Sequence, residues 1–302
     1  MTGRMLLTGC AAALTLVSAP FARAGATEDA AKAFADGKAL LAKADFAGAQ
    51  KAFAAAAKAD RDKPEYMQQY AMLRKVILLR DALPRETNAE KWQLMARSLR
   101  SYYLQNKVYS EALALDQKVH AKLNNTDSAV SLAQTQLAMG LNADAARLLG
   151  GIEEKAATPE SRILLGIALA REKKMDEARA IAAKVDPPAD AGAGLYYDTA
   201  CLRALTGDTT GALLMLTRAF ELTPPSRLES VKAGAKEDKD LASLVSSPEF
   251  AKVMKTESKV KESSCSGGSD CGSCPSRSGC SSAKGAASCA KDDKAACPAE
   301  KK

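Results

Sequence analysis

The chain of 302 residues carries a formal net charge of +7, is 47% hydrophobic and has few aromatic residues. Its one histidine, His120, almost excludes histidine-based metal sites and acid–base catalysis, and we expect it on a helix surface without a fixed partner. The lysines and arginines are spread along the sequence, whereas nucleic-acid binding requires them clustered on one face, so no nucleic-acid partner is expected.

The first 26 residues have the layout of a secretory signal peptide. Arg4 supplies a basic start, residues 5–18 are mostly apolar, and two A-x-A cleavage sites lie within residues 22–26. The apolar run is too short to span a bilayer, so we expect cleavage and no membrane span. The residues before Cys10 resemble a bacterial lipobox, but the apolar run preceding this cysteine is short, which makes a lipoprotein the less favoured alternative. We therefore expect an exported bacterial protein, located in the periplasm or secreted.

The mature chain is predicted to begin with two helices joined by a tight turn, over residues 27–43 and 46–59, because apolar residues recur there at helical spacing. A long helix is predicted from Pro64 to about residue 83. Proline is favoured in the first turn of a helix, and Pro84 stops this one. Since this helix has no tight-turn partner, we interpret it as an inserted or capping helix.

Four helix pairs are predicted next. Thr87 and Glu90 have the spacing of a capping box, which predicts a helix start at about residue 88. The predicted pairs are 88–106 with 109–122, 126–139 with 142–155, 159–172 with 175–185, and 190–205 with 208–221. After Pro225 the pattern weakens, and two short closing helices are predicted over 240–244 and 248–253.

An alanine recurs near the start of the second helix of each pair. Ala112, Ala145, Ala178 and Ala212 are separated by 33, 33 and 34 residues, and an earlier copy is Ala49. A constant period of about 34 residues indicates a helical repeat array. The small side chain allows two helices to cross at close range, so we expect it to be a packing residue.

A helix pair with a tight turn and a small residue at the crossing resembles the tetratricopeptide repeat (TPR), and the resemblance covers residues 28–222. The last pair matches best, with Gly207 and Asp208 at the turn, Ala212 at the crossing and Pro224 at the exit. No pair has the family's tryptophan, and Arg100 stands where a small residue is usual. The resemblance implies an all-α fold: a right-handed superhelical α-solenoid of TPR-like pairs and closing helices over residues 27–257. An ordinary helical bundle is the alternative.

Proteins of this family bind a protein or peptide in the concave groove formed by the first helix of each pair. The resemblance therefore implies a protein-binding scaffold or adaptor of the bacterial cell envelope. Helical spacing places these residues in the groove: Arg97, Ser101, Gln105, Val130, Gln134, Ile163, Arg171 and Tyr197. The Lys/Asn pattern that grips a chain-terminal carboxylate is absent, so recognition of such a carboxylate is not expected. No nucleophile has a base in view and no phosphate-binding motif is present, so no enzymatic activity is expected.

Residues 258–302 are rich in Ser, Gly, Lys, Ala and Cys and nearly lack aliphatic side chains, which predicts a disordered tail. Its six cysteines are Cys265, Cys271, Cys274, Cys280, Cys289 and Cys297. In an exported protein they could form three disulfides, with 15 possible connectivities. The C-x-x-C of Cys271 and Cys274 also suits a soft metal such as Cu(I) or Zn(II), or a thiol redox function. An exported protein that binds thiophilic metals or exchanges disulfides through this tail is thus the alternative function; otherwise no cofactor is expected. The remaining mature cysteine, Cys201, is expected to pack as a small apolar residue or to face the groove.

Overall fold

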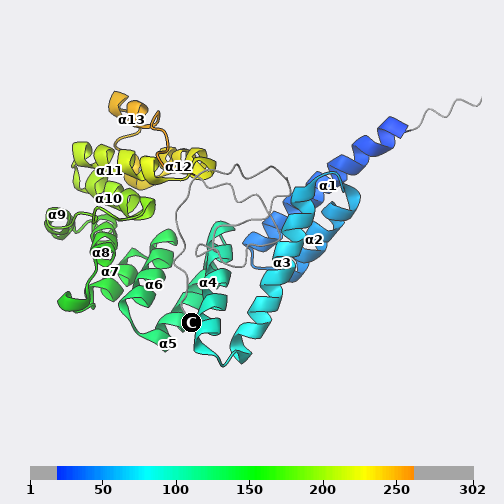
Figure 1. Cartoon of the computed structure of the whole chain (residues 1–302), viewed down its shortest axis with the longest axis horizontal. Coiled ribbons are helices and arrows are strands. Elements are labelled where there is room, and N and C mark those ends of the chain that lie inside the picture. Colours follow the sequence, from blue (N-terminus) through cyan, green and yellow to red (C-terminus); the bar gives the residue numbers. More distant parts are fainter. Residues whose placement is uncertain (1–18, 262–302) are drawn as a thin grey trace, which may run out of the picture.

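The computed structural model describes residues 19–261, with side chains described from residue 27 onward. Within this range every regular element is helical and no strand occurs (Figure 1). The α-helices are α1 (Ala19–Ala42), α2 (Phe46–Ala59), α3 (Pro64–Ala82), α4 (Ala89–Gln105), α5 (Tyr109–Leu123), α6 (Thr126–Ala138), α7 (Asn142–Gly150), α8 (Pro159–Arg171), α9 (Met175–Ala182), α10 (Ala193–Thr206), α11 (Thr209–Leu222), α12 (Pro225–Glu237) and α13 (Pro248–Val253). Short 3-10 helices are η1 (Leu83–Arg85), η2 (Glu154–Ala156) and η3 (Lys239–Leu241). None of these α-helices combines the length and apolar character that crossing a membrane requires.

The predicted helices are confirmed from α1 to α11, and most ends agree within one to three residues. Five local predictions were wrong. The helix α1 begins at Ala19, not at 27, because the alanine-rich residues before Thr27 continue the helix. Residues 240–244 form the end of η3 and a turn, not an α-helix. The helix α7 ends at Gly150, not at 155, because the chain turns there into η2. The cap of α4 is Asn88, whose side chain accepts a hydrogen bond from the Lys91 N–H, so the Thr87–Glu90 capping box does not form. The helix α12 was not predicted at all, although Pro225 opens it in the favoured first-turn position.

The tight turns inside two pairs have a clear sequence cause. Asp45 caps α2 and Asp208 caps α11, and each carboxylate accepts a hydrogen bond from the backbone N–H of a glycine three residues later. A Cβ at Gly48 or Gly211 would collide with that carboxylate. An Asp-x-x-Gly sequence therefore fixes the reversal that lets two consecutive helices pack side by side.

The recurring alanines lie where helices cross. Each helix from α4 to α9 packs against the next one, α6 also contacts α8, and α8 also contacts α10. All five alanines of the repeat, Ala49, Ala112, Ala145, Ala178 and Ala212, are 0% exposed. The prediction that they are packing residues is confirmed.

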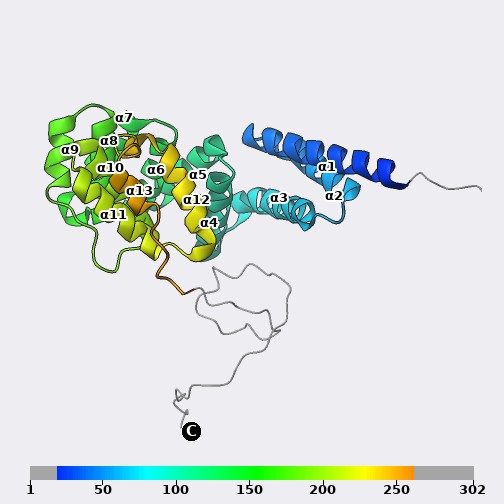
Figure 2. The ribbon, with the colours of Figure 1, turned by 90° about the horizontal axis from the view of Figure 1, so that it is seen from above.

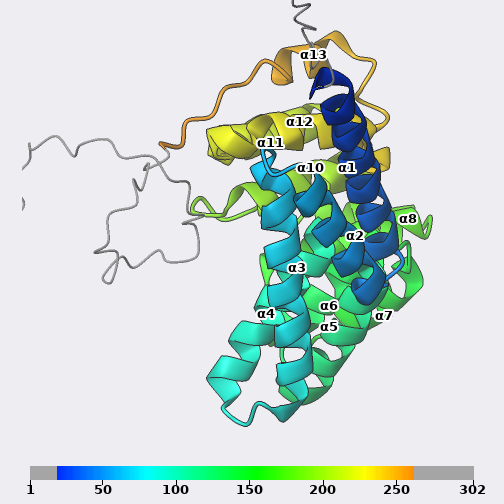
Figure 3. The ribbon, with the colours of Figure 1, turned by 90° about the vertical axis from the view of Figure 1, so that its right-hand side faces the viewer.

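The described helices bury two main cores. One is formed by α1–α5 and contains Phe53, Leu73 and Leu99. The other is formed by α6–α13 and includes leucines from beyond the repeats. Figure 2 shows the corresponding arrangement, in which α1–α3 form one end of the molecule and α8–α11 lie at the other. Figure 3 views the molecule from the end formed by α1–α3.

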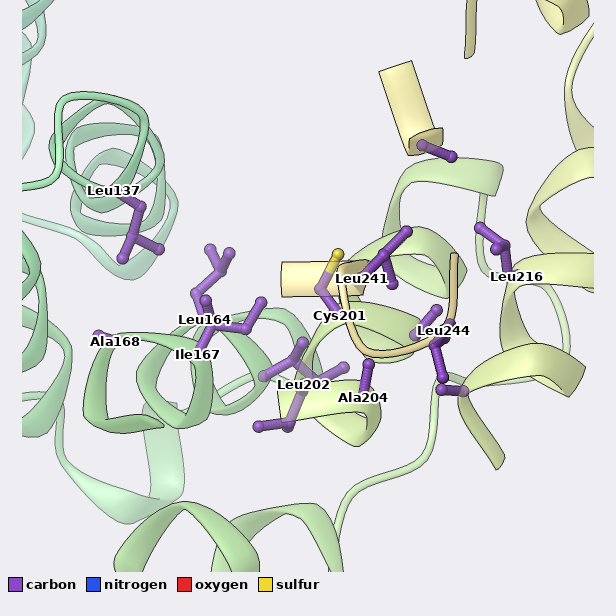
Figure 4. Packing of buried hydrophobic residues seen from close by; sticks show 14 of the residues in the cluster. Leu137, Leu164, Ile167, Ala168, Cys201, Leu202, Ala204, Leu216, Leu241 and Leu244 are labelled. Carbon is purple, nitrogen blue, oxygen red and sulfur yellow. The ribbon is translucent and has the colours of Figure 1, made fainter. Parts of the chain in front are cut away.

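Residues 238–244, here called the closing segment, complete the second core. They comprise η3 and the turn that follows it, and Leu241 and Leu244 are both 0% exposed. Figure 4 shows these two leucines among Cys201 and Leu202 of α10 and Leu216 of α11. The segment is therefore packed into the array as firmly as the helices themselves.

The chain after α13 returns to α11. The Lys259 backbone N–H donates a hydrogen bond to the Glu221 carbonyl oxygen (2.8 Å), and its Nζ lies 2.6 Å from Glu221 Oε1. Lys259, at the start of the predicted tail, is thus held against α11. The rest of that tail, with all six of its cysteines, lies outside the described residues, as do Cys10 and residues 1–18 of the predicted signal peptide.

Candidate functional site

Steps of 33 or 34 residues relate the first helices of the four pairs, α4, α6, α8 and α10. We define three rows of equivalent positions, which together form the first-helix face. The first row is Arg97, Val130, Ile163 and Tyr197. The second row is Ser101, Gln134, Ile167 and Cys201, and the third is Gln105, Ala138, Arg171 and Leu205.

At the C-terminal end of the array, the first-helix face borders a pocket of about 270 Å³ that the closing segment shares. Its lining residues are Gln134, Leu137, Ala138, Leu164, Ile167, Arg171, Tyr197, Asp198, Cys201, Asp238 and Asp240. Six of these residues belong to the three rows, so equivalent positions from α6, α8 and α10 converge here. The sequence spacing had correctly grouped Gln134, Arg171 and Tyr197.

Arg171 binds Asp240 through two parallel hydrogen bonds. Its Nε lies 3.0 Å from Oδ1 and its Nη2 lies 2.6 Å from Oδ2 of the carboxylate. The third nitrogen, Nη1, donates to the Leu137 carbonyl oxygen at 2.9 Å, so one guanidinium ties together α8, α6 and η3. Burial alone would lower the pKa of Arg171, but the hydrogen bonds and charge of Asp240 raise it above its usual value.

Asp238 is held by α10. Its Oδ2 accepts a hydrogen bond from the Tyr197 hydroxyl at 2.9 Å and a weaker one from the Cys201 thiol at 3.8 Å, while Oδ1 accepts from the Asp240 N–H at 3.0 Å. Burial, reinforced by the Asp238 charge, raises the pKa of both the Tyr197 hydroxyl and the Cys201 thiol. Both groups therefore remain protonated and act as hydrogen-bond donors, and a reactive thiolate is not expected at Cys201.

Asp198 lies beside this network and is the one carboxylate that it leaves without a donor: among residues 19–261 it forms no hydrogen bond or ion pair. Burial raises the pKa of Asp198 to about 7, and the nearby charges of Glu160 and Asp238 add to the effect. Asp198 and Tyr197 also border a second pocket of about 490 Å³ between α10, α11 and α12. The protonation state of Asp198 consequently changes close to neutral pH.

Donor atoms of Cys201, Asp238 and Asp240 lie within 4.8 Å of one another, a grouping that could in principle hold a metal ion. Their existing partners argue against this use. Asp240 is neutralised by a guanidinium, Asp238 accepts three hydrogen bonds, and the thiol is protonated. The two aspartates instead hold the closing segment against α8 and α10 through their bonds to Arg171 and Tyr197.

The first-helix face of α4 is uncovered. Leu94, Arg97, Ser101 and Gln105 follow one another at spacings of three or four residues, so they form a single exposed stripe. Leu94 is 61% exposed, and Gln105 Nε2 donates to Ser101 Oγ at 3.2 Å. Within the described chain Arg97 makes no ion pair. Three of the eight predicted groove residues thus lie together and are accessible.

A buried ion pair connects α4, α5 and α6 beneath this stripe. Arg100 Nε lies 3.0 Å from Asp116 Oδ1, and Arg100 Nη2 donates to the Ser131 carbonyl oxygen at 2.7 Å. Asp116 is 1% exposed and also accepts a hydrogen bond from Thr135 (2.6 Å). Burial raises the pKa of Asp116, although Thr135 and Arg100 partly oppose that shift. Arg100, which departs from the repeat pattern, therefore replaces close packing with a charged link between neighbouring pairs.

Next to this ion pair is a pocket of about 170 Å³ whose walls include the apolar side chains of Trp92, Ala96, Val119 and Leu123. Arg97 and Asp127 also line it. The pocket opens beside the α4 stripe, so a ligand lying along that stripe could place an apolar side chain in it.

Several predicted side-chain positions need correction. Val130 and Ile163 are buried, at 6% and 0% exposure, because both belong to the second core. Gln134 is half-buried, accepts a hydrogen bond from Arg100 and donates one to Glu160, so it links α4, α6 and α8. His120 is also half-buried, and its Nδ1 lies 3.0 Å from Ser128 Oγ, so it has the fixed partner that the sequence did not indicate.

Asp198, Asp238 and Asp240 were not predicted as site residues. One signal could have pointed to the last two: an Asp-x-Asp-Leu sequence directly after the array offers acidic partners for Arg171 and an apolar residue for the core. No sequence signal singles out Asp198, because only its surroundings in three dimensions distinguish it.

No family model matches this sequence, and no curated protein matches it either. The site therefore has to be interpreted from its own geometry.

Proposed function

We propose that the protein is an exported scaffold or adaptor of the bacterial cell envelope. In this proposal the helix pairs are TPR-like repeats of a right-handed superhelical solenoid, and the first-helix face is its concave, partner-binding side. The stacking of α4 to α11, with an alanine at each crossing, supports the family resemblance. Pro64–Ala82 (α3) is then the inserted helix between the first repeat and the others.

The observation that carries the proposal is the contrast between the two ends of the first-helix face. On α8 and α10 the closing segment covers the face: Arg171 is paired with Asp240, and Tyr197 donates a hydrogen bond to Asp238. On α4 the equivalent positions Arg97, Ser101 and Gln105 are exposed, and the apolar Leu94 lies beside them. An exposed stripe of donors with an apolar residue and an adjoining pocket has the composition of a protein-binding surface.

Affinity capture from envelope extract tests this function. The bait is the full chain, compared with an Arg97→Glu variant and with a matched control, Arg179→Glu, on the exposed surface of α9. We expect the wild type and the control to enrich the same partner and the Arg97 variant to lose it. If none of the three proteins enriches a partner over an unrelated bait, the result contradicts the proposal.

A second candidate function rests on the six cysteines between residues 265 and 297. Through them the exported protein could bind thiophilic ions such as Cu(I) or Zn(II), or exchange disulfides. Cys201 is buried and hydrogen-bonded, so it would not contribute a ligand. Titration of the reduced full chain with Cu(I) against a chelator tests this candidate: competition should survive Cys201→Ala and disappear when the six cysteines are replaced by serine.

A further inference from the structure

The closing segment shows what the first-helix face can hold. Its Asp238 is bound by first-row Tyr197 and second-row Cys201, and its Asp240 by third-row Arg171. The occupied positions thus accept two carboxylates that are separated by one residue in the chain. Leu241, which follows directly, is fully buried.

From this arrangement we infer that the uncovered stripe on α4 binds an acidic peptide segment whose carboxylates are spaced two residues apart and are followed by a large apolar residue. The inference rests on the proposed function and adds the chemistry of the partner. The stripe presents residues of the same three rows, Arg97 in the first, Ser101 in the second and Gln105 in the third. All three lie on α4, whereas the occupied positions lie on α10 (Tyr197 and Cys201) and on α8 (Arg171).

The three polar side chains of this stripe each offer a donor to a carboxylate. Arg97 offers a guanidinium that has no ion-pair partner among residues 19–261, Ser101 offers a hydroxyl and Gln105 offers an amide. A guanidinium and a carboxylate form charge-assisted hydrogen bonds, which are stronger than neutral ones. The stripe therefore selects an acidic ligand over a neutral or basic one.

The spacing of the donors also fits. Positions four residues apart on a helix are separated by about 6 Å along its axis, since each residue rises about 1.5 Å. Alternate residues of an extended peptide lie about 6.6 Å apart, and their side chains point to the same side. Carboxylates at alternate positions of an extended peptide can therefore meet Arg97 and Ser101, or Ser101 and Gln105, in succession.

The apolar residue of the ligand has two places to contact. Leu94 lies one turn before Arg97 and is 61% exposed. On the other side of Arg97, which belongs to its lining, lies the pocket walled by Trp92, Ala96 and Val119. A leucine next to the acidic residues would bury its side chain there, away from water, just as Leu241 is buried in the second core.

The probe for a direct test is a fluorescent peptide with the sequence of residues 236–246, added to the reduced full chain. A second peptide carries the changes Asp238→Asn and Asp240→Asn. Fluorescence anisotropy measures binding to the wild type, to Arg97→Ala and to the control Arg179→Ala. Circular dichroism confirms that the variants are folded, as expected for substitutions of exposed side chains.

We expect saturable binding of the acidic peptide to the wild type and the control. Because a charge-assisted hydrogen bond is lost, binding should weaken about tenfold with Arg97→Ala or with the asparagine peptide. Absent binding, equal binding of both peptides, or equal binding by the Arg97 variant would overturn the inference. So would concentration-dependent dimerisation that Arg97→Ala abolishes, because the occupant would then be a second copy of the chain.

The envelope capture separates this inference from the proposed function. Suppose that a partner is captured, and that it is still captured by the Arg97→Glu variant and in the presence of excess acidic peptide. This result would overturn the inference but would leave the scaffold function standing. Peptide binding with the expected dependence on Arg97, without any captured partner, would support the inference and contradict the scaffold function.

Discussion

Arg171 and Asp240 are separated by 69 residues in the sequence, yet they share a two-pronged ion pair in the structure. The pair joins the end of α8 to η3, and the third guanidinium nitrogen reaches the last turn of α6. One side chain thus connects two repeats to a segment that belongs to none of them.

Removal of this arginine should be costly. In Arg171→Ala the carboxylate of Asp240, which is 6% exposed, loses its charged partner and stays buried. Because the Arg171 side chain is 27% exposed, water can partly replace it, and we expect a loss of about 2–3 kcal/mol in the free energy of unfolding. Urea denaturation followed by circular dichroism measures this loss.

A double variant and a control variant show whether this loss comes from the ion pair. Arg171→Ala combined with Asp240→Asn should be less destabilised than the sum of the single changes, because the unpaired charge has been removed. Arg179→Ala, whose nearest carboxylate is 3.7 Å away on an exposed surface, should change stability by no more than about 0.5 kcal/mol. Additive effects of the two changes at the pair would show that the ion pair is not coupled.

Asp198 should make stability depend on pH near neutrality. Its folded-state pKa is raised to about 7, whereas an unfolded aspartate has a pKa of about 3.9, so the folded state holds a proton that the unfolded state releases. The resulting stabilisation is complete below about pH 4 and is lost as the pH rises to about 7. Because Asp198 is only half-buried, we expect the effect to reach about 1–2 kcal/mol.

Asp198→Asn removes that titration. Relative to the wild type, the variant should gain about 1–2 kcal/mol in the free energy of unfolding between pH 4 and pH 8. Chemical denaturation at both pH values gives the difference. A difference between variant and wild type that is the same at pH 4 and at pH 8 would show that Asp198 ionises normally.

The first helix of the third pair tolerates no side chain at Gly166. A Cβ there would lie 2.8 Å from Leu202 Cδ1, and Leu202 is 0% exposed and cannot move aside freely. Gly166→Ala should therefore destabilise the protein by about 1–3 kcal/mol, measured by thermal or urea unfolding. Gly194→Ala is the matched control: it lies in the first turn of α10 with open space around it and should be neutral or slightly stabilising.

Loss of the Arg100–Asp116 pair should destabilise the protein more at neutral pH than at acidic pH. In Arg100→Ala, Asp116 keeps the hydrogen bond from Thr135 but has no countercharge, so an ionised carboxylate is left almost fully buried. We expect a loss of about 3 kcal/mol at pH 7 and a smaller loss at pH 4, where protonation of Asp116 relieves the unpaired charge. An equal loss at both pH values would mean that the contribution of Arg100 is packing alone.

Most of the fold could be predicted from the sequence because its signals are local. Tight turns, prolines at helix ends and alanines at constant intervals each act within a few residues, and the structure places them as expected. The helix α12 escaped prediction because its apolar face is narrow: only Leu228, Val231 and Ala235 lie at helical spacing among charged and small residues.

The candidate site was only partly predictable because its completion is not local. Helical spacing groups Gln134, Arg171 and Tyr197 correctly, but it cannot show that a segment beyond the repeats covers two of them. The same spacing treats Arg97 and Tyr197 as equivalent, although only the first is exposed. Which part of a repeated surface is accessible depends on what lies beyond the last repeat.

The covered end of the array also has a consequence for synthesis. A chain made from its N-terminus can fold α1–α5 around their own core early, since those helices bury Phe53 and Leu99 without help from later residues. The last pair cannot be completed in this way, because Leu241 and Leu244 supply part of its core. Until those residues have left the ribosome, Leu202 and Leu216 of the last pair lack part of their cover, and the nascent protein exposes an apolar surface that the finished one does not.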